Sequence, residues 1–572
     1  MHKLKIMIFS FIFFSNCSGI KQATILAPLA PTEIKSEHES FGEKFMIASQ
    51  GRNSTTAGKK MFKLGGNAVD AAAAISFSIS VERPQSTGIG GGGFMLIKTP
   101  AMDEPLALDF REKAPLKAHA KMYLDKNENI IKNKSLNGIF SVGTPGLVAG
   151  VLQAHKKFGK LPLHIVMEPA ITLASKGFKI YPELDRALKA KQKVLELFPS
   201  TKKIFFRNNK VMKLGDLLIQ KDLAKTLETI AKKGLDGFYK GWVAKKIVKT
   251  SKKYGGLIRK NDLLKYNVVN RKPIKGEYKG KVIYSMAPPS SGGVHVVQIL
   301  NTIENDGLGK YGPHHPKTVH LVSSAMQQAF ADRARYLGDS DFVRVPIGNL
   351  ISKKYAKKIR ESINDKSKKI KSVKAGVFKE HDETTHFSVA DSVGNVVVST
   401  QTINGWFGSG LVADGTGIVL NNEMDDFATK VGASNLFGAI GGSNNLVAPM
   451  KRPLSSMSPT IVLKDNQPLL ALGPPSGTRI LTCVTSVILN YLEHELPLYD
   501  AVAAVRYHHQ WSPDEIRVDK PGFPISVKKE LENKGYKINV KNLGCSIQAI
   551  VYENGFLHGV SDPRGQGMSY GE

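Results

Sequence analysis

The most constraining feature of the sequence is a pair of strand-like segments between residues 384 and 402. THFSVAD (385–391) alternates in polarity with a period of two, VGN (393–395) supplies a turn, and VVVSTQT (396–402) returns as a second strand. The pattern predicts a β-hairpin that begins directly after Thr384. The pair Thr384-Thr385 at its head follows a lysine-rich stretch, which raises the question of whether the chain is cut there.

The rest of the chain is typical of a mixed α/β protein. Hydrophobic residues make up 42% of the 572 residues, which allows a substantial core and argues against global disorder. This length allows several domains or one large α/β body. The best internal boundary lies near residue 380, where a helix-rich, basic composition gives way to a strand-rich one. The predicted elements are helices at 65–82 and 317–365, amphipathic helices within 160–275, strands at 106–115 and 417–422, a strand–loop–helix unit at 281–304 and a strand–turn–helix unit at 469–492.

The N-terminal residues have the layout of a secretory signal. Lys3 and Lys5 precede an apolar run, Ile6 to Phe14, that is too short for a stable membrane span. We therefore assign roughly residues 1–24 to a signal peptide. The mature protein is expected to be exported, either periplasmic or secreted, without a transmembrane segment.

The chain has only three cysteines, Cys17, Cys483 and Cys545. Cys17 offers a lipidation site, but Asn16 fits poorly before a lipidated cysteine, so a lipid anchor is the less favoured alternative. Two cysteines remain once the signal is removed. They exclude a disulfide scaffold and leave a single Cys483–Cys545 bridge open.

The formal net charge is +31, with lysines spread through 186–275 and concentrated in 353–379. A patch for polyanions or a membrane surface is one interpretation. The dense run has little aromatic interleaving and no nucleic-acid motif, so a solvated lysine-rich face is favoured and no nucleic-acid partner is expected.

One glycine motif has the wrong context for a nucleotide site. Gly88, Gly90 and Gly93 match GxGxxG, but here a helix precedes the glycines and a strand follows. Close packing of the backbone is the favoured role.

Metal and serine-hydrolase sites find little support. His381 and His386 lack the spacing of a zinc motif, and His508 and His509 are adjacent, so no metal or cofactor is expected. The sequence contains no GxSxG nucleophile elbow. Two serine pairs are candidates for substrate-contacting hydroxyls or for capped turns, namely Ser290-Ser291 and Ser455-Ser456.

A threonine nucleophile is the remaining chemistry. A hydroxyl is a weak nucleophile that needs a base, and an N-terminal threonine supplies its own α-amine, whose reference pKa lies near 8. Thr384 becomes N-terminal only if the Glu383–Thr384 bond is broken. Its hydroxyl could attack the preceding carbonyl and form an ester that water opens.

Several blocks in register resemble the γ-glutamyltranspeptidase family over nearly the whole mature chain. They are GGNAVDAA, GIGGGGFM, LDFREKAP, GTPG and PPSSGG upstream, and HDETTHFSV, TQTINGWFGSG, LNNEMDDF, KRPLSSMSPT and GPPSGTRI downstream. The resemblance implies an N-terminal nucleophile hydrolase fold, an αββα sandwich built by two subunits from one precursor. The large subunit would be 25–383 and the small catalytic subunit 384–572, held as a heterodimer.

The resemblance also implies roles for single residues. Thr384 would be the nucleophile of both self-cleavage and catalysis, with Thr402 orienting its hydroxyl. Arg111 would bind the α-carboxylate of a γ-glutamyl group, because its planar fork suits a carboxylate. The remaining predicted roles are a neutral carboxylate donor (Ser455), the partner of the α-ammonium (Asp426), further contacts to the head group (Asn404, Glu423, Ser456), and backbone N–H donors to the oxyanion (Ser476, Gly477).

Three positions depart from the family pattern. Ser476-Gly477 stands where Gly-Gly is frequent, which leaves the backbone donors in place if the φ/ψ of Ser476 is allowed. Glu383 precedes the cleaved bond, where relatives can carry other residues. Phe437, in the lid-like segment 431–442, replaces a tyrosine of some bacterial members and would keep an apolar cover without the hydroxyl.

The sequence therefore predicts a self-processing γ-glutamyltransferase and glutathione hydrolase. Its partners would be glutathione or similar compounds, and an amino acid or dipeptide acceptor. The nearest alternative is a glutaryl- or cephalosporin-acylase-type amidase of the same fold, whose substrate lacks the α-ammonium. A distant alternative is a non-catalytic, basic surface-binding protein. Residues 366–383 would form a charged C-terminal tail of the large subunit that leaves the site after cleavage.

Overall fold

Two seven-stranded antiparallel sheets frame the computed structural model, which describes residues 37–367, 384–553 and 555–572. From residue 37 on, the described residues belong to one compact unit. Sheet 1 has the strand order β1 (Glu39–Gly42), β20 (Phe556–Ser561), β19 (Gln548–Glu553), β15 (Gln467–Gly473), β14 (Thr460–Lys464), β11 (Lys281–Ser285), β10 (Ile274–Tyr278). Sheet 2 has the order β21 (Met568–Gly571), β2 (Phe45–Ser49), β12 (Thr385–Asp391), β13 (Val396–Thr402), β3 (Gly92–Lys98), β4 (Leu106–Asp109), β9 (Val269–Arg271).

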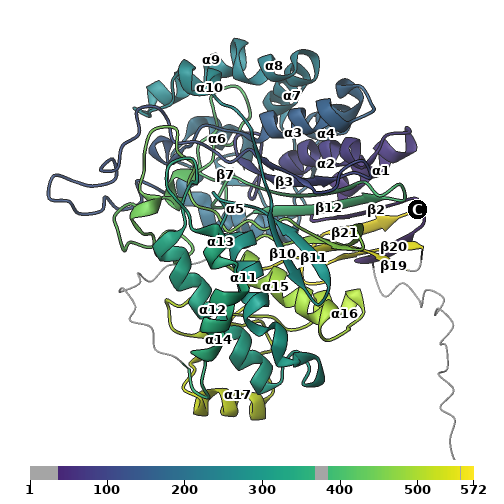
Figure 1. Cartoon of the computed structure of the whole chain (residues 1–572). Coiled ribbons are helices and arrows are strands. Elements are labelled where there is room, and N and C mark those ends of the chain that lie inside the picture. The colour runs from purple at the N-terminus through teal and green to yellow at the C-terminus, as the bar shows by residue number, and fades with distance from the viewer. Residues whose placement is uncertain (1–36, 368–383, 554) are drawn as a thin grey trace, which may run out of the picture. The chain divides into compact units, whose positions relative to one another are not determined.

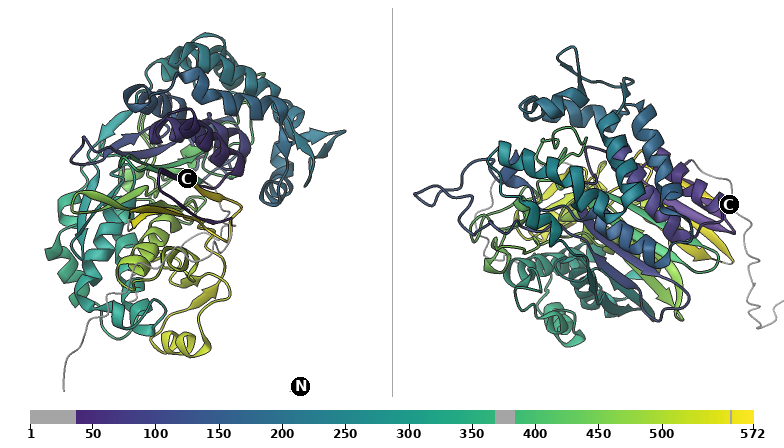
Figure 2. Two further views of the ribbon diagram at one scale, coloured as in Figure 1. Left: turned by 90° about the vertical axis from the view of Figure 1, so that its right-hand side faces the viewer. Right: turned by 90° about the horizontal axis from the view of Figure 1, so that it is seen from above.

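Helices cover the outer face of each sheet (Figure 1). Those packed over sheet 2 are α1 (Arg52–Lys63), α2 (Ala68–Glu82) and α3 (Leu147–Phe158), with α4 (Leu163–Lys176), α5 (Pro182–Leu195), α7 (Lys221–Lys233) and α9 (Gly241–Lys253) beyond them. Those on the side of sheet 1 are α11 (Gly292–Ile303), α12 (Pro316–Tyr336), α14 (Lys353–Glu361), α15 (Arg479–Leu492), α16 (Leu498–Ala503) and α17 (Ile525–Asn533). Figure 2 shows the same layers from the side. The predicted αββα sandwich is confirmed.

The hairpin at 385–402 is confirmed as β12 and β13, and its alternation serves two cores. Phe387 and Val389 pack toward the helices over sheet 2, whereas Ala390 and Val398 face the layer between the sheets. β12 lies between β2 and β13 in mid-sheet, so both of its edges are hydrogen-bonded. Because a register shift of one residue would exchange its two faces, this burial fixes the position of the strand's first residues.

Each sheet contains strands from both sides of residue 384. β12 and β13 pair with β2 and β3, and β14 pairs with β11. The composition change near residue 380 is therefore no boundary between separately folded bodies. The chain on either side of this point is held to the other by sheet hydrogen bonds.

Most predicted helices are found, with corrections at their ends. The helix predicted at 65–82 is α2, which begins after Asn67 because its side chain accepts from the N–H groups of Val69 and Asp70. The helix predicted at 317–365 is wrong as one element. It is broken into α12, α13 (Ile347–Leu350) and α14 by a turn-rich segment that contains Pro346, a residue that cannot continue a helix.

Two predicted strands also need correction. The strand expected at 106–115 ends at Asp109, whose carboxylate accepts from the N–H of Arg111 and so turns the chain. Arg111 therefore lies just beyond β4. The strand expected at 417–422 is reduced to one isolated bridge, Val412 with Val419. The side chain of Asn421 takes the N–H groups of Gly143 and Glu423, which favours a loop over a ladder.

The disulfide that the sequence left open is formed. Cys483, on α15, is bonded to Cys545, in the loop before β19, and both are buried. No helix of the described part is long and apolar enough to cross a membrane. The proposed signal, Cys17 and the segment 368–383 lie outside the described residues, and the lysines that α14 contributes to the basic run are exposed.

The glycine motif packs backbone against backbone. A Cβ on Gly90 would lie 2.2 Å from the carbonyl oxygen of Val419, and one on Gly93 would lie 2.4 Å from that of Thr400 on β13. At Gly88 the nearest atom would be at 3.8 Å, an ordinary contact.

We expect Gly93→Ala to lower the free energy of unfolding by about 2 kcal/mol or more, because β3 and β13 cannot separate without breaking their ladder. Thermal denaturation followed by circular dichroism measures this. Gly88→Ala is the matched control and should change the melting temperature little. Equal effects of both substitutions would contradict the packing role of Gly93.

Candidate active site

Thr384 directly precedes β12 and lines a small pocket. Its Oγ1 lies 3.2 Å from Oγ1 of Thr402, at the end of β13, and either hydroxyl can be the donor. Thr402 Oγ1 also accepts from the N–H of Asn404 at 2.8 Å. The hairpin thus places two hydroxyls together and fixes the direction of the Thr402 oxygen.

The backbone of Thr384 is unusual. Its φ is 97°, a value that glycine favours and that a β-branched residue rarely adopts. The residue is buried, and the adjacent Thr385 is paired in the ladder with Gln401. Such conformations cost of order 1–3 kcal/mol and persist only where the surrounding structure imposes them.

A buried charge cluster lines the same pocket. The guanidinium of Arg111 donates to Glu423 through Nη1 and to Asp426 through Nη2. Its Nε donates to the carbonyl of Pro453 at 3.3 Å. Burial alone would lower the pKa of Arg111, but Glu423 and Asp426 outweigh burial and raise it, so the guanidinium stays charged.

A third carboxyl, Glu112, lies beside this cluster. Burial raises the pKa of Glu112 to about 7, and burial with the neighbouring Glu112 raises that of Glu423. Two buried carboxyls in contact cannot both ionise without a large cost, so the pair tends to share a proton. The charged groups around the head of the pocket are therefore close to balance, because Arg111 and Arg333 carry two positive charges, and Asp426 and the proton-sharing pair carry two negative ones.

The two serine pairs have different places. Ser455 and Ser456 line the pocket, and Ser455 Oγ accepts from the N–H of Met457. Ser290 and Ser291 lie behind them. Ser291 Oγ donates to the carbonyl of Ser455 at 2.9 Å, and Ser290 Oγ donates to that of Met457 at 2.7 Å. The second pair therefore supports the first.

The lid-like segment 431–442 lies over the pocket. Phe437 is buried, and its ring lies so close to Gly477 that a Cβ there would come within 2.3 Å of it. Asn435 joins the lid to the charge cluster, because its Nδ2 donates to Asp426 at 2.7 Å. The N–H of Leu436 donates to Asp425 at 2.8 Å. Phe437 thus lines the pocket with a buried apolar ring.

Gly477 lines the pocket near Thr384, two residues before the first residue of α15. The N-terminal end of a helix carries a partial positive charge that favours an anion. Ser476 is fully buried, and its hydroxyl points away from the pocket and donates to the carbonyl of Leu543. Of the predicted oxyanion pair, Gly477 therefore contacts the pocket and Ser476 lies behind it.

All other predicted site residues of the described chain gather here. Thr384, Thr402, Arg111, Asn404, Glu423, Asp426, Ser455 and Ser456 line one pocket, whereas Glu383 lies outside the described residues. The sequence missed five lining residues, namely Arg333, Asn435, Met457, Thr478 and Ile480. Arg333, on α12, donates to Ser291 Oγ at 3.1 Å, and burial together with Arg111 lowers its pKa to about 10. Arg333 is a single arginine within a helical stretch, and nothing in the surrounding sequence pattern indicates that it lines the pocket.

The histidines have structural positions. His386 is buried on β12 against Thr400 and Ser388, and burial lowers its pKa to about 3, so it is neutral. His508 is buried beside Thr482 and Gln510 with a similarly lowered pKa. Within 37–367, 384–553 and 555–572, no group of three or more His, Cys, Asp or Glu residues could hold a metal ion.

The Asp425 carboxyl makes the lid sensitive to pH. Burial raises its pKa from 3.8 to about 7, although Ser135 and Leu436 donate to it. A carboxyl whose folded-state pKa is raised favours folding while protonated. Its contribution is full below the unfolded-state value and is lost as the pH rises toward the folded-state value.

We expect the Asp425→Asn variant, whose side chain stays neutral, to gain in melting temperature relative to the unchanged protein as the pH rises from about 4 to 7. The difference should then level off. Asp465→Asn, at an exposed loop position, is the control. A melting-temperature difference for Asp425→Asn that does not vary with pH would contradict the prediction.

Comparison with known proteins agrees with this geometry. The Gamma-glutamyltranspeptidase family model matches residues 54–571. The glutathione hydrolase proenzyme of Escherichia coli (strain K12) is 45% identical over 551 residues, 95% of each chain. The solved gamma-glutamyltranspeptidase of Helicobacter pylori is 47% identical, with a TM-score of 0.54 over 55% of this chain and 90% of that one. The cephalosporin acylase of Bacillus halodurans has a TM-score of 0.82 over 96% and 99% at 24% identity, a likeness of fold alone. The chain belongs to the gamma-glutamyltranspeptidase family.

Proposed function

We propose that this protein is a self-processing γ-glutamyltransferase and glutathione hydrolase. One observation carries the proposal. The hydroxyls of Thr384 and Thr402 line the same pocket as Arg111, which lies between Glu423 and Asp426. A nucleophile and a site for an amino-acid head group thus share one small space.

Self-cleavage would release the strain at Thr384. Its hydroxyl adds to the carbonyl carbon of Glu383, and the peptide C–N bond breaks as the nitrogen takes a proton. The resulting ester is opened by water, which leaves a carboxyl on Glu383 and a free α-amine on Thr384. Once the bond is broken, Thr384 has no φ restricted by a preceding peptide. The φ of 97° therefore favours the product.

The mature threonine would then act on the substrate. Thr384 Oγ1 adds to the γ-carbonyl carbon while its α-amine accepts the hydroxyl proton. Backbone N–H groups of Ser476 and Gly477 donate to the oxyanion, assisted by the N-terminal end of α15. As the amide C–N bond breaks, the α-ammonium returns a proton to the leaving amine, which is Cys-Gly when the substrate is glutathione.

The γ-glutamyl ester would be resolved by a second nucleophile. Water yields glutamate, and the amine of an amino acid or dipeptide yields a new γ-glutamyl amide. In both cases the nucleophile adds to the γ-carbonyl carbon, the bond between that carbon and Thr384 Oγ1 breaks, and Oγ1 takes a proton from the α-ammonium that the nucleophile had protonated. The hydroxyl of Thr402 orients Thr384 Oγ1 in each step, and every group involved belongs to the protein or its substrates.

The charge cluster supports a zwitterionic head group. A γ-glutamyl substrate brings one carboxylate and one ammonium, so it can insert between Arg111 and its carboxylates and leave the charge balance unchanged. Its carboxylate would take the fork of Arg111 with Ser455 and Ser456, and its ammonium would take Asp426, Glu423 and Asn404. A glutaryl group has no ammonium and would separate Arg111 from Asp426 without compensation.

The interleaved sheets support two subunits that stay together after cleavage. The large subunit would comprise residues 25–383 and the small one 384–572, and strands of both lie within each sheet. The signal-like residues 1–24 support export to the periplasm or the medium. The tail proposed at 366–383 falls almost wholly on residues outside the described ranges and stays a prediction.

We expect the purified protein to give two bands of about 38 and 20 kDa on a denaturing gel, from division of the 62.4 kDa chain at Thr384 after loss of the signal. Thr384→Ala should leave one band, because no hydroxyl remains, whereas Thr384→Ser should still be cut. Thr385→Val is the matched control and should be cut normally. N-terminal sequencing identifies the bond, and a new terminus elsewhere, or processing of Thr384→Ala, would refute the mechanism.

We expect L-γ-glutamyl-4-nitroanilide to be cleaved faster than glutaryl-4-nitroanilide, which has the same leaving group. Asp426→Ala should lower kcat/KM for the γ-glutamyl compound by roughly 100-fold or more, because a buried ammonium loses its partner. The glutaryl compound should be affected much less. Asp426→Asn keeps an acceptor for Asn435 and isolates the charge. Faster release from the glutaryl compound by the unchanged enzyme would favour the acylase alternative.

A further inference from the structure

The backbone at the proposed oxyanion site is held in a region that favours glycine. Gly477 has a φ of 56°, which glycine adopts freely, but Ser476 has a φ of 111°. Ser476 is completely buried, so solvent cannot supply partners that would offset the cost. Because a serine with a free choice would leave this region, something in the fold must keep it there.

The side chain of Arg479 lies where it can hold Ser476 at a positive φ. Its Nη2 donates to Ser476 Oγ at 2.9 Å, and its Nε donates to the carbonyl of Leu543 at 2.6 Å. Ser476 Oγ in turn donates to the same Leu543 carbonyl at 2.7 Å. Three groups from two parts of the chain thus close a triangle of hydrogen bonds, with the guanidinium of Arg479 fully buried. We call Ser476, Arg479 and Leu543 the clamp.

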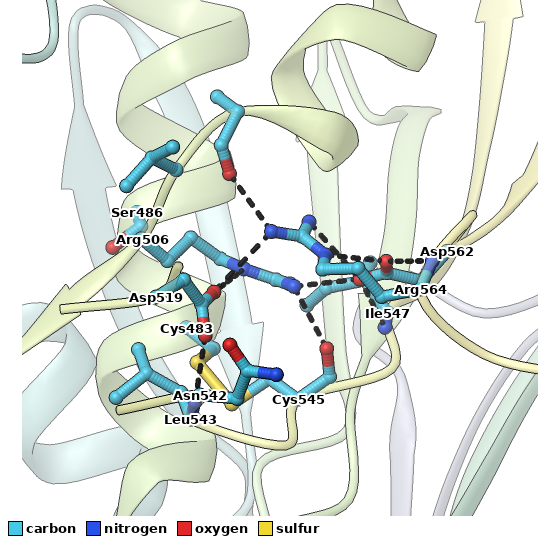
Figure 3. A network of polar contacts seen from close by, with 12 residues as sticks. Cys483, Ser486, Arg506, Asp519, Asn542, Leu543, Cys545, Ile547, Asp562 and Arg564 are labelled. Carbon is cyan, nitrogen blue, oxygen red and sulfur yellow. Dashed lines mark hydrogen bonds and ion pairs between the residues drawn. A yellow bond between two sulfur atoms is a disulfide. The ribbon is translucent and has the colours of Figure 1, made fainter. Parts of the chain in front are cut away.

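The Leu543 corner of the clamp is fixed by a second set of contacts, seen in Figure 3. The N–H of Leu543 donates to Asp519 at 2.6 Å. Two residues on, Cys545 is bonded to Cys483, which lies one helical turn after Arg479 on α15. The disulfide therefore joins the helix that carries Arg479 to the loop that carries its acceptor.

A buried ion pair holds the same loop from its other side. Arg506 Nη2 donates to the carbonyl of Cys545 and to Asp562 Oδ2, both at 2.7 Å. Asp562 also accepts from the N–H of Ile547. Figure 3 shows Arg506 and Arg564 side by side between Asp519 and Asp562. The loop 543–547 thus has little freedom to follow Ser476 if that residue relaxes.

We propose that Arg479 is a positioning residue for the oxyanion site, and that the clamp, tied by the Cys483–Cys545 disulfide, keeps Ser476 in its glycine-like conformation. The inference rests on the proposed function of the site. Without the clamp, Ser476 would relax toward negative φ and rotate the peptide units that carry the N–H groups of Ser476 and Gly477. The head-group end, at Arg111, would not change.

The two ends of the pocket predict a separation of kinetic constants. Groups that contact the substrate only as the oxyanion develops affect kcat, whereas the head-group contacts set KM. Arg479→Lys keeps the charge but cannot make both bonds of the fork. We expect it to lower kcat by roughly 10- to 100-fold, below the full loss of one oxyanion donor, with KM changed less than about twofold.

Glycine at position 476 gives the decisive control. Ser476→Gly supplies the second reference background of the cycle, because glycine keeps the backbone N–H and adopts a φ of 111° without strain. In the Ser476→Gly background, Arg479→Lys should cost less than about threefold in kcat, since no strained serine remains to be held. A variant with Cys483 and Cys545 both changed to alanine should also lose kcat, by a smaller factor than Arg479→Lys. In the Ser476→Gly background, this loss of kcat should disappear. Thr485→Val, further along α15, is the control for a general loss of helix stability.

The cycle is measured with whichever anilide the unchanged enzyme cleaves, because both substrates form the same oxyanion. Failure to cleave the γ-glutamyl compound would overturn the proposed function without bearing on the clamp. Equal losses of kcat from Arg479→Lys with serine and with glycine at 476 would overturn the clamp. An Arg479→Lys variant that melts at a lower temperature but retains kcat would also overturn the clamp.

Discussion

The pairing of β12 inside sheet 2 is the constraint on which the rest of the site depends. The strand is hydrogen-bonded on both edges and buried on both faces, so its first residues have one position available. That position sets Thr384 beside Thr402 at the end of β13. A nucleophile on a central strand is held more firmly than one on a loop. The same pairing would retain the two subunits once the chain is cut.

The head-group end of the pocket follows from a different principle. Arg111 follows a turn made by Asp109, and its two acceptors come from the short helical segment 423–426, more than 300 residues away. Buried charges are tolerated only when they are compensated, and Arg111 is paired with Glu423 and Asp426. A ligand that replaces these pairs must bring both signs of charge. The pairing of Arg111 is thus the basis of the selectivity expected of the site.

The sequence predicts elements that depend on a local pattern of residues, but it does not predict contacts between residues that are far apart along the chain. The period-two alternation along 385–402 and the turn at 393–395 are local signals, so the hairpin was predictable. The segment 417–422 also has β-branched and other apolar residues, as a strand would. However, the side chain of Asn421 accepts hydrogen bonds from backbone N–H groups, which favours a loop. Resemblance to a family brought the site residues of distant segments together. Arg333 was missed because its contact with Ser291 joins two helices and leaves no periodic trace.

Thr384 and Ser476 both have a positive φ, and the costs of the two conformations differ in duration. At Thr384 the strained torsion includes the bond that the proposed self-cleavage would break, so the cost would end when the enzyme matures. At Ser476 the torsion lies within an uncut chain, so the cost remains through every turnover. A transient strain can drive a reaction, but a permanent one must be balanced. This difference accounts for the two surroundings. Thr384 lies where the proposed cleavage would make it an N-terminus, whereas Ser476 is enclosed by Arg479, Leu543 and a disulfide.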